Sequence, residues 1–275
     1  KGEVFFRASR RAVNDVIALL KDRSLNAYST TDAARFRDHM IDRGLVSSTV
    51  KRVFAIIRAI INLSIQEHGL SCKNAFAKTY IPDLEDTFKR QPIPINIIRK
   101  VQEECVVIND PNRWLIALIS DTGMRLSEAL GLKVDDLKLY EDVPYVNIVP
   151  NSSRQLKTKS SERKIPLVGL SLWAAQQISA NRNDAFAFPH YTNKDYCSSN
   201  SASAALNKWL KSRVPERCVI HSFRQSKRDR LREVNCPTEM IDQIGGWSDN
   251  KVGSSYGNGY SLAKTIKVLS KIVKY

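Results

Sequence analysis

The sequence predicts a mainly α-helical protein with one small antiparallel sheet, an α+β fold divided into two domains. Its length of 275 residues is close to twice that of a usual domain of about 100–200 residues. Apolar residues recur with helical spacing over most of the chain, and only the stretch between Leu137 and Leu167 changes to short extended runs. A hydrophobic content of 43% and a mean hydropathy of −0.32 are those of an ordinary folded chain.

Residues 1–82 are expected to form an all-helical domain. Its strongest helix is predicted between Ser47 and Gly69, because Ser47 begins a run of capping hydroxyls and Gly69 is a typical helix end. Apolar side chains recur there at steps of three or four residues, namely Val50, Val53, Phe54, Ile57, Ile60 and Ile61. Two shorter helices are predicted near residues 9–21 and 30–43.

A highly charged stretch between Pro82 and Pro92 separates the two domains. We expect residues 83–91 to be the linker and residues 92–275 to form the second domain. In that domain, helical patterns lie near residues 96–107 and 113–119, and extended runs lie over 145–149 and 164–167. Helical patterns resume from residue 170 and are interrupted by three prolines.

The formal net charge of +15 and the pI near 9.7 make nucleic acid the expected partner, because a polyanion releases counterions when a basic protein binds it. Both predicted domains are basic, as in a chain that grips a duplex from two sides. No apolar run is long enough to span a membrane, and the first residues lack the order of a signal peptide. The five cysteines are scattered, so we expect a reducing cytoplasm and neither a disulfide framework nor a zinc ribbon.

Neither a metal site nor a cofactor site is expected. The four histidines show no HxxxH or HExxH spacing, so a transition metal would lack ligands. The acidic residues between Asp83 and Asp86 are better explained as part of a charged linker than as a magnesium site. P-loop and GxGxxG signatures are absent, and Gly245-Gly246 alone is a weak signal.

Basic and aromatic residues of the second domain form the pattern that points to chemistry. The run TGMRLSE places Arg125 after a glycine turn and near a helix start, where backbone N–H groups and a guanidinium can hold an anion together. The run HSFR spaces His221 and Arg224 so that both lie on one face of a helix. The candidate catalytic residues are Arg125, Lys157, His221, Arg224, Trp247 and Tyr256.

Each of these residues also has a purely structural explanation. Arg125 could pair with Glu128, and His221 could cap the helix that follows it. Trp247 could belong to the core, and Tyr256 could lie on a loop between helices. The order of the motifs along the chain carries more information than any one of them.

In that order, TGMRLSE, a hairpin lysine, HxxR, GGW and a tyrosine nine residues later resemble the tyrosine recombinase (phage integrase) family over nearly the whole chain. The resemblance implies an N-terminal core-binding domain followed by a catalytic domain. It implies that the scissile phosphate of DNA is attacked by Tyr256 and surrounded by Arg125, Lys157, His221, Arg224 and Trp247.

Elementary chemistry agrees with these roles. Two guanidiniums, Arg125 and Arg224, can stabilise the charge that develops on the non-bridging phosphate oxygens without a metal. A tyrosine with a pKa of about 10 needs a neighbour that accepts its proton, and His221 is the best candidate. The departing 5′-oxygen needs a proton, which we assign to Lys157. The resulting 3′-phosphotyrosyl link conserves the bond energy, so rejoining needs no ATP.

Two assignments keep an alternative. Lys159 lies two residues from Lys157 and takes the role of the acid if the register of the turn differs. Tyr260 is a second hydroxyl four residues beyond Tyr256. Many relatives have histidine where this chain has Trp247, whose indole N–H can still donate one hydrogen bond to a phosphate oxygen.

We expect double-stranded DNA as the partner and a homotetramer on a DNA synapse. The C-terminal residues 261–269 either pack on their own domain or dock on a neighbouring protomer. No arm-type DNA-binding domain precedes the helical unit, and the chain starts abruptly at Lys1, so we expect a fragment. Two other functions fit the same fold, a non-catalytic DNA-binding regulator and a type IB topoisomerase-like enzyme that relaxes DNA.

Overall fold

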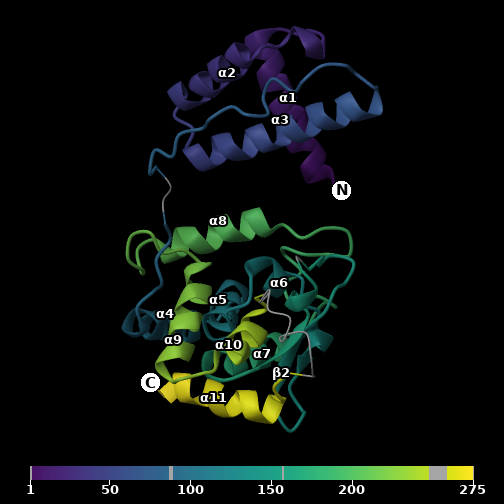
Figure 1. The fold of residues 1–275 in the computed structure, drawn as a ribbon. Helices are drawn as coiled ribbons and strands as arrows, with labels where there is room; N and C mark the ends of the chain where they lie inside the picture. The colour runs from purple at the N-terminus through teal and green to yellow at the C-terminus, as the bar shows by residue number, and fades with distance from the viewer. Residues whose placement is uncertain (1, 87–88, 157, 248–258, 275) are drawn as a thin grey trace. The chain divides into compact units, whose positions relative to one another are not determined.

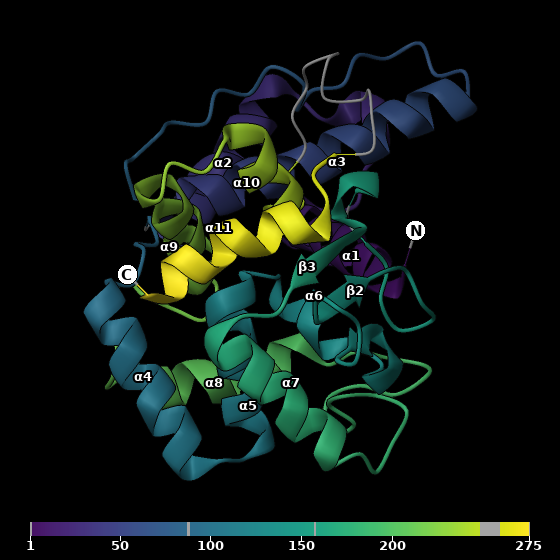
Figure 2. The same cartoon turned by 90° about the horizontal axis from the view of Figure 1, so that it is seen from below.

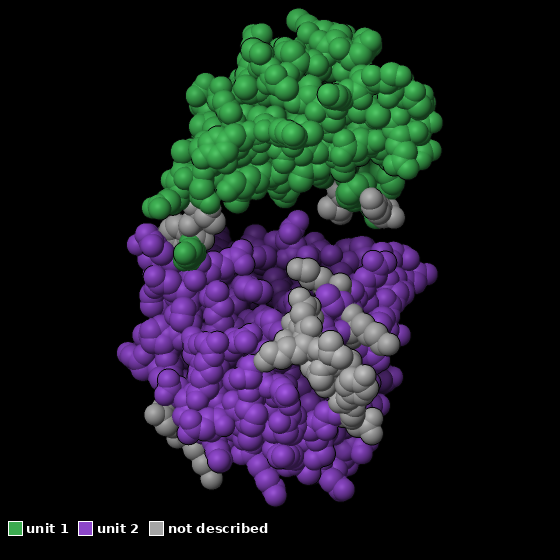
Figure 3. Space-filling view, in the orientation of Figure 1, with its two compact units in different colours: residues 1–89 green, residues 90–275 purple. Residues whose placement is uncertain are grey.

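The computed structural model describes residues 2–86, 89–156, 158–247 and 259–274 (Figure 1). The chain divides into two compact units, residues 1–89 (unit 1) and residues 90–275 (unit 2), which Figure 3 colours separately. The division between them lies inside the stretch for which the sequence predicts a linker. The predicted α+β class is confirmed, since helices dominate and the strands of the described residues form one small sheet.

Unit 1 contains α1 (Glu3–Leu20), α2 (Thr30–Asp42) and α3 (Ser47–Glu67), with a 3₁₀ turn over Leu25–Ala27. The first helix begins six residues earlier than its pattern predicted, with Gly2 as its N-cap. A capping box fixes the start of α2, in which the Ser29 hydroxyl accepts from the Asp32 N–H and the Asp32 carboxylate accepts from the Ser29 N–H. The buried core of unit 1 consists of Ala12, Val16, Leu20, Ala33, Phe36, Met40, Val50, Phe54, Ile57 and Phe76.

The acidic residues of the predicted linker contact α3. The Asp86 carboxylate accepts from the backbone N–H of Ser47 at 2.8 Å, which caps the helix N-terminus. The Lys51 ammonium lies 3.2 Å from the Asp83 carboxylate and holds the pKa of that carboxyl below its usual value. These carboxylates therefore have partners within unit 1.

Unit 2 is built around a buried helix. Its helices are α4 (Ile95–Ile108), α5 (Pro111–Thr122), α6 (Leu126–Leu130), α7 (Gly169–Ala180), α8 (Ser199–Leu210), α9 (Ser222–Glu233), α10 (Thr238–Gly245) and α11 (Leu262–Lys274). All eight residues from Leu115 to Thr122 are buried, as expected for a helix that has neighbours on every side. The helices α4, α6, α7 and α9 pack against α5. Nowhere in the described ranges is a helix both long and apolar enough to cross a bilayer.

The sheet consists of β1 (Leu137–Lys138), β2 (Tyr145–Ile148) and β3 (Arg163–Pro166), all antiparallel in the order β1-β2-β3. In its register Val146 faces Ile165, and both are fully buried. The patterns of β2 and β3 were predicted, whereas β1 has only two residues and is too short to show alternation. The connection between β2 and β3 carries the two candidate lysines. Lys157 lies outside the described residues, and Lys159 begins a 3₁₀ turn over Lys159–Ser161.

The C-terminal helix packs on its own unit. It lies against α9 and β3, as Figure 2 shows, and it buries Thr265, Leu269 and Ile272. Arg230 of α9 donates to the carbonyl of Ile272 at 3.1 Å, which satisfies one of the free carbonyls at the helix end. These contacts correspond to the expected packing of this segment on its own domain.

Candidate functional site

Arg125 stands at a junction of three segments. Gly123 ends α5 with a left-handed backbone (φ 65°), and Arg125 then occupies the N-cap position of α6. Its guanidinium Nη1 donates to Glu128 Oε1 at 2.5 Å and to Ser161 Oγ at 3.2 Å, and its Nη2 donates to the carbonyl of Gly246 at 3.3 Å. The side chain is 24% exposed, so it is oriented by protein and still reaches solvent.

The N-terminus of α6 is occupied by a carboxylate of the chain itself. The backbone N–H of Arg125 donates to Glu128 Oε2 at 2.8 Å. This one N–H is therefore paired within the protein, whereas the guanidinium of Arg125 remains partly exposed to an anion.

Arg224 is buried and donates to two backbone carbonyls. Its Nη1 lies 2.8 Å from the oxygen of Gly123, and its Nη2 lies 2.5 Å from the oxygen of Gly245. Burial first, and then the charges of Arg125 and Arg163, lower the pKa of Arg224 to about 9, so it stays charged at neutral pH. Among the described contacts only two of its five N–H groups are used, which leaves donors for a ligand.

His221 precedes α9 at its N-cap position and makes no side-chain capping bond. Its backbone is helical (φ −69°, ψ −20°) and its carbonyl accepts from the N–H of Arg224 at 3.1 Å, so the three-residue spacing places both residues on one side of the start of α9. His221 is an exposed residue, yet the protein around its ring desolvates it and lowers its pKa, and the charges of Arg90, Arg224 and Arg125 lower it further. A neutral imidazole at pH 7 can accept a proton.

Trp247 has two guanidiniums stacked over its ring system. The Cζ of Arg224 is 4.3 Å from the centre of its ring system, and that of Arg228 is 4.7 Å away. A side chain at Gly245 would place its Cβ 1.8 Å from Trp247 Cζ3, so the ring needs glycine there. Trp247 also packs against the core of unit 2. The expectation that Trp247 packs with the core is therefore met, and its ring also contacts a predicted site residue, Arg224.

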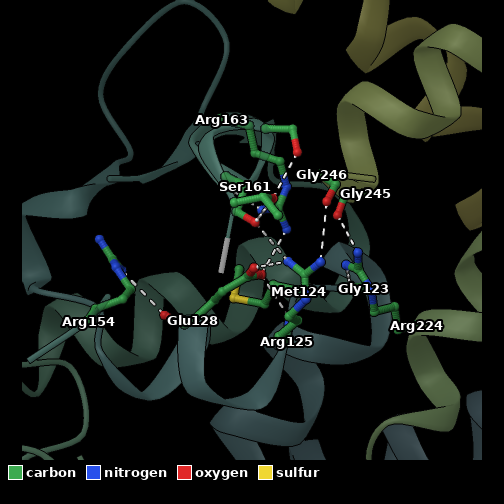
Figure 4. A network of polar contacts seen from close by, with 12 residues as sticks. Gly123, Met124, Arg125, Glu128, Arg154, Ser161, Arg163, Arg224, Gly245 and Gly246 are labelled. Carbon is green, nitrogen blue, oxygen red and sulfur yellow. Dashed lines mark hydrogen bonds and ion pairs between the residues drawn. The ribbon is translucent and has the colours of Figure 1, made fainter. Parts of the chain in front are cut away.

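The structure brings in side chains that the sequence did not single out. Arg163, at the start of β3, donates to Glu128 Oε2 at 2.9 Å, and Ser161 Oγ accepts from Arg125 (Figure 4). Burial alone would raise the pKa of Glu128, but Arg163 and Arg125 hold it below its ordinary value. The sequence indicates Glu128 only as a structural partner of Arg125. For Arg163 the sequence shows no sign of a role in the site, since the residue simply precedes an apolar run.

Two predicted site residues, Lys157 and Tyr256, lie outside the described residues. The alternative nucleophile, Tyr260, is described, and its backbone is held by Gln243, which donates to its carbonyl at 2.9 Å and accepts from its N–H at 2.8 Å. The Nζ of Lys264 lies 4.9 Å from the centre of the Tyr260 ring.

The arrangement is suited to one anion. Arg125 and Arg224 donate to the adjacent carbonyls of Gly246 and Gly245, so their guanidiniums lie side by side (Figure 4). With Arg163 they outnumber Glu128, the one carboxylate that this group of contacts contains among the described residues. A phosphate would relieve the mutual repulsion of these desolvated cations.

Comparison with known proteins gives one family. The model of the phage integrase family matches residues 97–260, which is more than half of the chain. The transposase from transposon Tn916 of Enterococcus faecalis is 25% identical over 182 residues, which cover 59% of this chain and 42% of the transposase. Tyrosine recombinase XerC of Psychromonas ingrahamii is 21% identical over 245 residues, which cover 86% of this chain and 79% of XerC.

Two solved structures share the fold. The Tn1549 transposon integrase in complex with a circular intermediate DNA has a TM-score of 0.70 at 19% identity, with 98% of this chain and 89% of the integrase covered. A lambda integrase dimer bound to a COC′ core site has a TM-score of 0.68 at 16% identity, with coverage of 95% and 74%. The chain spans less than half the length of the Tn916 transposase that it matches.

Proposed function

Because the chain belongs to the phage integrase family, we propose that it is a tyrosine recombinase, which cleaves and rejoins double-stranded DNA through a 3′-phosphotyrosyl intermediate. The observation that carries the proposal is the pair of guanidiniums, Arg125 and Arg224, held side by side by the carbonyls of one glycine turn. Such fixed donors stabilise the charge of a phosphodiester under attack and need no reorganisation during the reaction.

In the proposed reaction, the phenol oxygen of Tyr256 attacks the scissile phosphorus. The bond from phosphorus to the 5′-oxygen breaks, and the 3′-phosphate becomes linked to Tyr256. His221 accepts the phenol proton, which its lowered pKa supports, because the imidazole is neutral at pH 7. Lys157 donates a proton to the departing 5′-oxygen. A second 5′-hydroxyl reverses these steps and completes the strand transfer.

Trp247 has a further role in this proposal. Its ring contacts the guanidiniums of Arg224 and Arg228, and this stacking orients the indole N–H. We assign it one hydrogen bond to a non-bridging phosphate oxygen, the place taken by histidine in many relatives.

For the partner, we propose duplex DNA bound by both units, with unit 1 as the core-binding domain and unit 2 as the catalytic domain. Both parts of the sequence are basic, and the net charge is +15. The Tn1549 and lambda integrases were solved on DNA, and lambda integrase was also solved as a tetramer on a Holliday junction. By analogy we propose a homotetramer on DNA for this chain.

A nicked suicide duplex that carries the attachment site tests the proposal. We expect a covalent protein–DNA adduct on a denaturing gel, and Tyr256→Phe should abolish it while duplex binding persists. An adduct that survives Tyr256→Phe and is lost in Tyr260→Phe moves the nucleophile to Tyr260. The proton donor is identified by assaying Lys157→Ala and Lys159→Ala on a substrate with a 5′-thiol leaving group, which needs no acid. The variant that has lost the proton donor should recover its cleavage rate on this substrate.

The same assay separates the alternatives. Binding without any adduct in the wild-type protein overturns the recombinase and leaves a DNA-binding regulator. An adduct that reseals only to the original strand, and never to a second duplex, indicates a topoisomerase-like enzyme.

A further inference from the structure

Arg163 is a buried arginine with no role in the reaction proposed above. It begins β3, and its side chain is 3% exposed. Its Nε donates to the carbonyl of Ile244 at 2.9 Å, its Nη1 to the carbonyl of Ser161 at 2.6 Å, and its Nη2 to Glu128 Oε2 at 2.9 Å. One guanidinium thus joins three segments that are far apart in the sequence.

Each of these segments also holds one of the two phosphate-directed arginines. Glu128 and Ser161 both accept from Arg125. Ile244 is followed by Gly245 and Gly246, whose carbonyls accept from Arg224 and Arg125 respectively. Figure 4 shows Arg163 above this group, with Glu128 reached by the guanidiniums of both Arg125 and Arg163.

The packing around Arg163 leaves it little freedom. Gly246 has a left-handed backbone (φ 62°), and a Cβ there would lie 2.7 Å from Arg163 Nη1. A buried guanidinium is costly unless its hydrogen bonds are satisfied, and a hydrophobic side chain of similar size would fill the space at lower cost. The three contacts therefore indicate a role beyond filling the core.

We propose that Arg163 is a positioning residue for the strand-cleavage step, which keeps Arg125 and Arg224 in the geometry that receives the scissile phosphate. The inference rests on the proposed function. Arg163 itself contacts no phosphate in this proposal and acts through Glu128 and the Ile244–Gly246 turn.

The charge of Glu128 gives the proposal a distinctive signature. The groups that face its carboxylate are Arg125 and Arg163, while Arg154 donates to its backbone carbonyl. Arg224 and His221 also interact electrostatically with it. Arg163 is the largest influence that lowers the pKa of Glu128 against the effect of burial. Without Arg163 the pKa of Glu128 rises, so its carboxylate takes up a proton, and loses its ion pair with Arg125, at a higher pH than in the wild-type protein.

The test compares Arg163→Met with Arg163→Lys in single-turnover cleavage of the suicide duplex over a range of pH. For Arg163→Met we expect a cleavage rate lower by about 100-fold, because misplaced groups cost that much, with DNA affinity nearly unchanged. Protonation of Glu128 should add an acid limb to its pH profile, at higher pH than in the wild-type protein and separate from the limb set by His221. Arg163→Lys should return the limb toward the wild-type position, because an ammonium stays beside Glu128. The matched control is Arg182→Met, which removes a 51% exposed arginine paired with Asp135 and should change nothing.

A folded Arg163→Met protein with the wild-type rate and pH profile would overturn the proposal. If the single variant does not fold, the pair Arg163→Met and Glu128→Gln removes both buried charges together. This double variant should cleave DNA slowly and lack the acid limb that Glu128 causes in Arg163→Met. A double variant that cleaves as fast as the wild-type protein also contradicts the proposal. If the wild-type protein forms no adduct, the proposed function fails, and the effect of Arg163 on Glu128 is tested separately by following the Glu128 carboxyl carbon by NMR over a range of pH. An unchanged titration midpoint of Glu128 in Arg163→Met would then refute the positioning role of Arg163.

Discussion

A single carboxylate organises the cations of the site. Glu128 is 3% exposed and accepts from the side chains of Arg125 and Arg163, so one negative charge orients two positive ones. Arg224 is oriented differently, by carbonyl oxygens that carry no charge. The guanidiniums are thus held firmly without being neutralised, which preserves their attraction for a phosphate.

The lowered pKa of His221 leads to a prediction about pH. A general base works only when neutral, so the cleavage rate should rise with pH and level off with a midpoint below 6.5, the ordinary histidine value. His221→Gln should lose this limb and about 100- to 10,000-fold in rate. Single-turnover rates between pH 5 and about 8 measure it.

The control for this prediction is His190→Gln. His190 is an exposed histidine of unit 2 that stacks edge-on with Tyr191, and its removal should leave the profile unchanged. An acid limb that persists in His221→Gln would assign the titration to another group.

At the level of elements, the last turn of α10 holds the chain on both sides of residues 248–258. Before that segment, the backbone N–H of Trp247 donates to the carbonyl of Asp242 at 3.0 Å. After it, Gln243 holds both backbone groups of Tyr260. Gly259 permits this approach with φ 70°, since a Cβ there would lie 2.6 Å from Gln243 Oε1. One short helix therefore anchors both ends of the segment that contains Tyr256.

We predict that Gln243→Ala weakens both the fold and the reaction. Two lost hydrogen bonds of about 0.5–1.5 kcal/mol each should lower the free energy of unfolding by about 1–3 kcal/mol. Cleavage should slow because Tyr256 lies only four residues before Tyr260. Denaturant unfolding and single-turnover cleavage measure the two effects.

Gln176→Ala is the matched control, because Gln176 is an exposed glutamine of α7. A Gln243→Ala protein with wild-type stability and rate would show that the contacts to Tyr260 contribute nothing.

At the scale of the whole molecule, the positive charge divides into two groups. Arg125, Arg163 and Arg224 are buried or half-buried and oriented in one place within unit 2. Exposed cations are distributed over both units, such as Arg52 of α3 and Lys208 of α8. The first group suits catalysis at one phosphate, and the second suits binding along a backbone of many phosphates.

If both units bind the same duplex, exposed cations of each unit should contribute to the salt dependence of binding. Arg52→Gln and Lys208→Gln should each lower the slope of log affinity against log salt by about one, and the double variant by about two. Fluorescence anisotropy with a labelled duplex at several salt concentrations measures the slopes.

Arg232→Gln provides the comparison, because Arg232 is 59% exposed but already paired with Asp229 at 3.0 Å. An unchanged slope in Arg52→Gln alone would remove this face of unit 1 from the DNA contact.

The sequence by itself determined the fold class, most helices and the order of the motifs. Periodic patterns between Ser47 and Gly69 and the run from Leu137 to Leu167 depend on neighbours close in the chain, so they were readable without coordinates. Arg125, Arg224 and Trp247 could be proposed as site residues for a similar reason, because each lies in a short local motif.

Only the tertiary structure decided what surrounds them. Arg163 meets Glu128 across 35 residues and Ile244 across 81, and no local pattern marks such pairings. The same holds for the Glu128 carboxylate, which accepts from Arg163 as well as from its near neighbour Arg125. Burial also shifts proton affinities, because desolvation lowers the pKa values of His221 and Arg224 only when the chain is folded around them. Residue types and their order follow from local sequence, whereas pairings and electrostatics depend on long-range packing.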